Sequence, residues 1–234
     1  MGFQIKNIKI NQEIRPLGLD IKKPLISWQF SSEKPMLQKQ MRIHVGTTED
    51  GNDVWDTGVL NRSRSIGTTY AGEALKPQTR YYVTVEAWDQ DGDYAKGTTD
   101  FETGLMNGTL KAWDQAAWIG GISTKKYNIL MREISLDKEV EKARLYVSAR
   151  GIYEAKINGV QVGEAYCSTG ISQFVHHIMY QTYDVTKDLK PGINGIGFMV
   201  GPGKWTDLYT YAEEKERFCE PRASVMAKLD ITYT

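Results

Sequence analysis

The segment Leu75–Gly92 (LKPQTRYYVTVEAWDQDG) constrains the fold of this chain more than any other. After a proline-containing turn, apolar positions alternate with a second set of positions. The apolar set is Tyr81, Val83, Val85 and Ala87, and the other set is Tyr82, Thr84, Glu86 and Trp88. Because side chains alternate across a β-strand, Tyr81–Trp88 is predicted to be a strand with one buried face.

Similar short runs, separated by Gly, Asp and Asn, predict strands throughout the chain. The further candidates are Leu25–Phe30, Gln40–Val45, Leu130–Leu136, Ala143–Ala149, Ile152–Ile157, Met179–Val185, Ile193–Val200 and Ala223–Tyr233. Turns are predicted at Thr47–Asn52 and Asp89–Asp93, where Gly51 and Gly92 can take a positive φ, and at Asn158-Gly159, which suits a type I′ hairpin. The best helical candidate, Tyr211–Phe218, is too short to decide a fold, so the chain is predicted to be all-β.

The order of turn and strand around Tyr81 resembles strand F of a fibronectin type III or immunoglobulin-like sandwich. In that fold a tyrosine closes the corner through a hydrogen bond between its hydroxyl and nearby backbone. Tyr81 is either that tyrosine or an ordinary core residue. The alternation fails around Thr103–Asp114, so we predict one such sandwich over residues 1–105 and a second β-sandwich, of Greek-key or jelly-roll type, over 106–234.

Charge and cysteine content exclude several classes of partner. The 29 basic and 29 acidic side chains cancel, which argues against nucleic acid and anionic membrane. No segment has the length of a membrane span, and MGFQIKNIKI lacks the features of a secretory signal. Cys167 and Cys219 have no zinc-ligand spacing; they are expected to be buried or half-buried free thiols, or a mutual disulfide.

Eight phrases in order resemble the N-terminal region of bacterial α-L-rhamnosidases. They are RPLGLDIKKPLISWQFSS (15–32), VWDTGVL (54–60), TRYYVTVEAWDQDG (79–92), FETGL (101–105), AAWIG (116–120), KARLYVSARGIYEAKINGVQVGE (142–164), YQTYDVT (180–186) and PGINGIGFMVG (191–201). The resemblance implies a fibronectin-like domain, then a jelly roll truncated at its C-terminus, from an inverting glycoside hydrolase whose (α/α)₆ barrel lies outside this chain.

The residues themselves indicate no catalytic site. Inverting hydrolysis needs two carboxyl groups about 6.5–9.5 Å apart, and only Asp207 with Glu213 or Glu214 lies near an aromatic-rich loop. A solvated loop is the more ordinary interpretation of these charges. No GxSxG, HExxH or phosphate-loop motif is present, so the chain alone is expected to be inactive.

The resemblance also implies a lectin-like role for the second domain, in which calcium and an aromatic side chain hold rhamnose. The candidate carbohydrate-binding residues are Glu154, Asn158, Trp205, Asp207 and Tyr209. The loops 170–174 (GISQF) and 201–205 (GPGKW) depart from the family's phrases. Asn158 is alternatively a hairpin residue, and Trp205 alternatively packs against the barrel, which would leave it exposed in this chain. No other cofactor is expected.

Two functions remain open. The chain is either a non-catalytic accessory part of an α-L-rhamnosidase, with the barrel and a rhamnose-containing glycan as partners, or a free-standing carbohydrate-binding or adhesion-type pair of sandwiches. The last predicted strand runs to the final residues, so we expect a piece of a longer protein. The sequence leaves open a bacterial cytoplasmic, periplasmic or secreted location.

Overall fold

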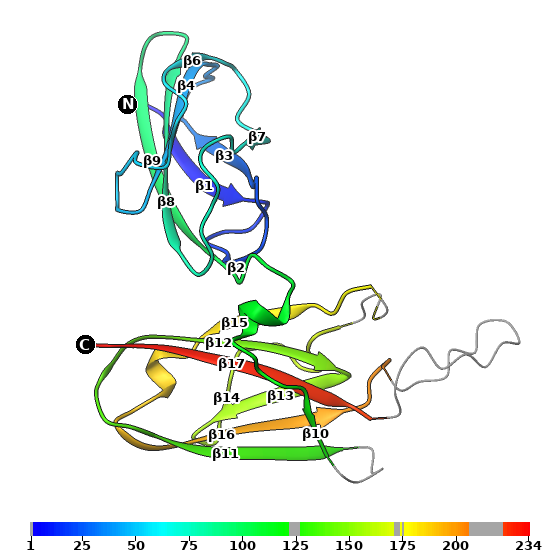
Figure 1. Cartoon of the computed structure of the whole chain (residues 1–234). Helices are drawn as coiled ribbons and strands as arrows, with labels where there is room; N and C mark the ends of the chain where they lie inside the picture. Colours follow the sequence, from blue (N-terminus) through cyan, green and yellow to red (C-terminus); the bar gives the residue numbers. More distant parts are fainter. Residues whose placement is uncertain (1, 122–126, 171–173, 175, 206–221) are drawn as a thin grey trace, which may run out of the picture. The chain divides into compact units, whose positions relative to one another are not determined.

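The chain forms two compact units, Met1–Gly108 and Thr109–Thr234, whose regular secondary structure is almost all β-strand (Figure 1). The structure is a computed structural model that describes residues 2–121, 127–170, 174, 176–205 and 222–234. Its helical content in these residues consists of two short 3₁₀ turns, η1 (Leu110–Trp113) and η2 (Thr186–Asp188). The predicted all-β fold is confirmed. No helix among the described residues is long and apolar enough to cross a membrane.

The first unit is a sandwich of two sheets. The smaller sheet has the order β1-β3-β7, comprising Gln4–Ile10, Leu25–Ser31 and Thr68–Thr69. The larger has the order β2-β9-β8-β4-β5, comprising Leu17–Leu19, Tyr94–Thr103, Arg80–Asp89, Gln38–Gly46 and Trp55–Asp56; β6 (Leu60–Asn61) also pairs with β4. Side chains of both sheets form one core that includes Trp28, Ile43, Val83 and Phe101.

Tyr81 closes a corner of this sandwich, the first of the two interpretations of this residue. Its side chain is buried, and the backbone N–H of Lys76 donates a 2.8 Å hydrogen bond to its hydroxyl. The ring stacks on Phe101 with centroids 5.4 Å apart. The alternation predicted for this strand is also confirmed, because Val83, Val85 and Ala87 share the buried face of β8.

The second unit packs two four-stranded antiparallel sheets face to face. One has the order β10-β17-β12-β15, comprising Ile119–Gly120, Ser224–Tyr233, Val140–Arg150 and Tyr180–Asp184. The other has the order β11-β16-β13-β14, comprising Asn128–Leu136, Gly192–Gly201, Ile152–Ile157 and Val160–Gln161. Leu145 and Val147 of the first sheet and Tyr153 and Phe198 of the second belong to one buried cluster, which places the core between the sheets.

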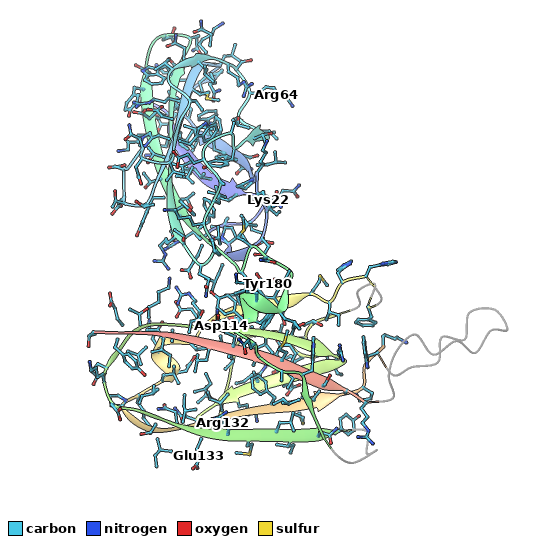
Figure 2. All side chains as sticks on the ribbon, viewed as in Figure 1. Lys22, Arg64, Asp114, Arg132, Glu133 and Tyr180 are labelled. Carbon is cyan, nitrogen blue, oxygen red and sulfur yellow. The ribbon has the colours of Figure 1, made fainter. Side chains whose placement is uncertain are left out.

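Residues 109–118 cover the outer side of the β10-β17-β12-β15 sheet. Lys228 on β17 forms a 2.6 Å ion pair with Asp114 and donates a 3.3 Å hydrogen bond to the carbonyl of Ala112. Trp113 packs edge-on against Tyr180, with centroids 5.5 Å apart, and Tyr146 beside it is fully buried. Figure 2 labels Asp114 and Tyr180 on this side of the unit, and Arg132 and Glu133 on β11 at the opposite sheet.

Three local predictions need correction or fall outside the described residues. Gly92 has the expected positive φ, but in the turn at Thr47–Asn52 the positive φ belongs to Asp50, not to Gly51. Cys167 is a free thiol as expected, yet it is exposed rather than buried; Cys219 is not among the described residues. The helical candidate Tyr211–Phe218 is outside them as well.

Candidate functional site

The predicted carbohydrate-binding residues do not form one cluster in the described part of the chain. Glu154 lies on β13, opposite Met199 of β16, and its half-buried side chain is on the outer face because Tyr153 and Ala155 on either side point into the core. Asp207 and Tyr209 lie outside the described residues, as do Glu213 and Glu214. The carbohydrate-binding assignment therefore stays a prediction.

Asn158 is an integral part of a hairpin. Asn158 and Gly159 have φ values of 51° and 85°, and they connect Ile157 directly to its partner Val160, as the type I′ prediction requires. The Asn158 side-chain amide donates to the carbonyl of Asp188 and to Oδ1 of Asn194, both at 2.9 Å. Its oxygen accepts a 3.0 Å hydrogen bond from the Gly195 backbone. These three bonds use both N–H donors of the amide and one of the two acceptor positions on its oxygen.

Asn194, which sequence reasoning missed, organises the loop beside this hairpin. Its fully buried side chain donates to the carbonyls of Lys190 and Gly192 at 2.6 and 3.0 Å, and its oxygen also accepts a bond from the Lys190 backbone at 3.0 Å. A buried amide that satisfies several backbone groups is costly to remove. In the sequence, only the polar character of this residue within the otherwise apolar predicted strand Ile193–Val200 indicated a special role.

Trp205 is buried, with 6% of its surface exposed, so the alternative interpretation of Trp205 as an exposed interface aromatic is wrong. Its ring contacts Phe174 edge-on, with centroids 5.4 Å apart. The guanidinium carbon of Arg150 lies 5.3 Å from the Trp205 ring and 4.6 Å from the Trp118 ring. Trp205 Nε1 and Arg150 Nε are buried without a hydrogen-bond acceptor among the described residues, which leaves two donors that a polar ligand or water could satisfy.

The clearest shifts in pKa have structural causes. The Arg42 guanidinium, 2.6 Å from Asp56, holds the pKa of that carboxyl well below its ordinary value. Burial raises the pKa of Tyr153, whose hydroxyl also bonds to Tyr183 at 2.9 Å. Tyr153 points into the core, away from its neighbour Glu154. In the part of the chain that the structure describes, no three His, Cys, Asp or Glu side chains are grouped as metal ligands.

The outer face of β11 and β16 carries a contiguous group of exposed apolar side chains, which we call the β11–β16 face. It comprises Tyr127, Ile129, Met131 and Met199. Ile129 pairs with Met199, and Met131 pairs with Gly197. Ile129 and Met131 are 72% and 77% exposed. Large apolar patches on soluble domains usually mark interaction sites.

Two family models match the chain, one in each unit. The "Rha78A-like, N-terminal immunoglobulin domain" matches residues 5–107. The "Alpha-L-rhamnosidase N-terminal domain" matches residues 138–234. Together the two matches account for most of both sandwiches.

The related proteins and solved structures extend well beyond the matched region. Alpha-L-rhamnosidases of Formosa agariphila and Alteromonas sp. are each 26% identical, covering 97% and 94% of this chain but only 28% and 26% of the relatives. The structure of the alpha-L-rhamnosidase from Dictyoglumus thermophilum matches with a TM-score of 0.84, and that from Aspergillus terreus with 0.85, both at 26% identity. They cover 98% and 99% of this chain. The chain spans about a quarter of the length of these relatives.

Proposed function

Because this chain carries the immunoglobulin-like and N-terminal domains of the α-L-rhamnosidase family, we propose that it is a non-catalytic accessory portion of such an enzyme. Its role is to pack against the catalytic portion and support it. The hydrolysis of terminal α-L-rhamnose then belongs to the part of the polypeptide outside these two domains.

One observation carries this proposal: both sandwiches match the family's N-terminal domains, while the whole chain corresponds to about a quarter of each relative. A glycosidase site needs two carboxyl groups flanking a sugar-sized cleft. The candidates in this chain, Asp207 with Glu213 or Glu214, were singled out only by their aromatic-rich surroundings.

Activity measurements test the proposal directly. The purified 234-residue chain should not hydrolyse an aryl α-L-rhamnoside, whereas the full-length product of the parent gene should. Turnover by the 234-residue chain that is lost on Asp207→Asn would overturn the proposal. A parent gene that encodes no further domain would instead favour the free-standing pair of sandwiches.

Carbohydrate binding by the second unit is the second candidate function. It is supported by the unpaired donors of Trp205 and Arg150, which lie together at one end of the sandwich. Aromatic rings and directional donors are common in sugar sites. Calorimetry with rhamnose, with and without calcium, should give heat that Trp205→Phe reduces, because phenylalanine keeps an aromatic ring but lacks Nε1–H. Absence of heat in both conditions would exclude this role.

A further inference from the structure

Strand β16 lies between β11 and β13 in the β11-β16-β13-β14 sheet and presents an unusual row of positions to the outer face of that sheet. Asn194, Phe198 and Val200 are buried, so the alternate positions of β16 point outward. These outward positions are Ile193, Gly195, Gly197, Met199 and Gly201. Gly195 and Gly197 therefore leave partly exposed backbone along the middle of the sheet, whereas Gly201 is buried beside Tyr127 and Ile152.

Internal packing does not explain two of these glycines. Neither Gly195 nor Gly197 has a positive φ. A Cβ at Gly195 would meet no heavy atom within 4 Å, and a Cβ at Gly197 would come within 3.5 Å of Met131 Cγ, an ordinary contact. Glycine inside a strand weakens it, and it often marks a place where another backbone or a ligand approaches closely.

Side chains of the neighbouring strands stand on both sides of this row. On β11, Ile129 and Met131 form an apolar stretch beside Met199 and Gly197, and the exposed Glu133 lies opposite Gly195. Glu154 and Lys156 of β13, opposite Met199 and Gly197, form a charged side. The result is a shallow trough with an apolar and a charged wall, which suits an amphipathic protein segment.

We propose that the β11–β16 face is the surface on which the remaining portion of the same polypeptide docks, with the glycine row allowing its backbone to approach the sheet. The inference rests on the proposed function and specifies the surface that the accessory role uses. We identify the docking partner from the relatives, because about three quarters of their length lies outside the matched region and a corresponding portion of this polypeptide would be available to dock.

The composition of the face favours a protein over a sugar. Its apolar part contains one isoleucine and two methionines beside a single aromatic, Tyr127; methionine is enriched at protein interfaces, whereas sugar sites typically stack the ring on aromatic faces. The opposite sheet is already covered by residues 109–118, through Asp114 and Lys228. The β11–β16 face has no such cover from the described residues.

Methionine oxidation gives a direct test. Met131 and Met199 are 77% and 44% exposed, and Met179, outside the face, is 45% exposed. In the 234-residue chain, peroxide should oxidise all three, as followed by mass spectrometry. In the full-length polypeptide Met131 and Met199 should be protected several-fold, while Met179 keeps its rate. Equal rates for Met131 and Met199 in both proteins would overturn the proposal.

A pair of variants tests the face itself. In the full-length polypeptide, Ile129→Arg should restore oxidation of its cross-strand neighbour Met199, whereas Val160→Arg, an exposed apolar position on β14 outside the face, should not.

Protection of Met131 in the 234-residue chain by added rhamnose would assign the face to a sugar. Protection that rises with concentration alongside a dimer mass would assign it to a second copy. Either result would overturn the proposal.

Failure of the docking face can be distinguished from failure of the proposed function. A full-length protein that hydrolyses the rhamnoside but leaves Met131 and Met199 unprotected contradicts the docking face alone. A full-length protein that protects both methionines but has no rhamnosidase activity contradicts the proposed function and leaves the docking face supported.

Discussion

Replacing Gly195 with threonine should stabilise the second unit of the isolated chain. The backbone at this position is ordinary extended strand, and a Cβ added there would have no heavy atom within 4 Å. A threonine there would reduce the freedom of the unfolded chain and favour the pleated conformation without creating a clash. The change would also place a side chain in the trough of the β11–β16 face.

The expected gain follows from two contributions. Glycine inside a strand costs roughly 0.5–1 kcal/mol relative to alanine, and strand propensities span about 1 kcal/mol. We therefore expect the free energy of unfolding to rise by about 1 kcal/mol. For a unit of this size, that gain corresponds to a melting temperature higher by about 4 °C.

The same substitution at Gly97 provides a matched control of opposite sign. Gly97 lies on β9, also without a positive φ, but a Cβ there would come within 2.8 Å of Ile5 Cγ2 and 3.1 Å of Ile8 Cδ1. Overpacking of this kind typically costs about 1–3 kcal/mol. Calorimetric melting of both variants measures the difference. A lower melting temperature for Gly195→Thr would refute the reasoning that internal packing leaves this position free.

Three further predictions concern the internal structure. Tyr81→Phe should lower the stability of the first unit by about 1–3 kcal/mol in urea unfolding, because it leaves a backbone N–H without its acceptor. Arg42 lowers the pKa of Asp56 in the folded state, so this pair contributes stability above the unfolded pKa that is lost as pH falls through the folded pKa. Asp56→Asn should therefore reduce stability at neutral pH and flatten its decline in acid, as measured by unfolding at a series of pH values. Asn194→Leu should cost at least about 2 kcal/mol in calorimetry, because it removes the partners of several backbone groups and of Asn158.

The features that could be predicted from the sequence depend on short-range patterns. Tyr81 is a candidate corner residue because a proline turn leading into an alternating strand resembles strand F of such a sandwich, and the structure favours this over an ordinary core tyrosine. Asn158-Gly159 was identified because few dipeptides tolerate two successive positive φ values. In both cases neighbours in the chain supply the decisive interactions.

Most of the features that were missed depend on neighbours distant in the chain, although the turn at Gly51 depends on residues beside it. At Gly51 the absence of a side chain avoids a contact 2.8 Å from Thr48 Oγ1, and Asp50 takes the positive φ instead. Trp205 is buried because Arg150 and Phe174 pack against it. Alternation could place Glu154 on the outer face, but only the pairing of β11 with β16 shows that a methionine and an isoleucine flank a row of glycines.

The cover that residues 109–118 provide sets a limit on how this protein can be divided. The family match to the second unit begins at residue 138, after η1, β10 and β11. A fragment cut at that position would lose an edge strand from each sheet and would leave Tyr180 without Trp113 and Lys228 without Asp114. The portable piece for expression or domain grafting therefore begins at Thr109, because the residues that resemble a linker belong to the fold.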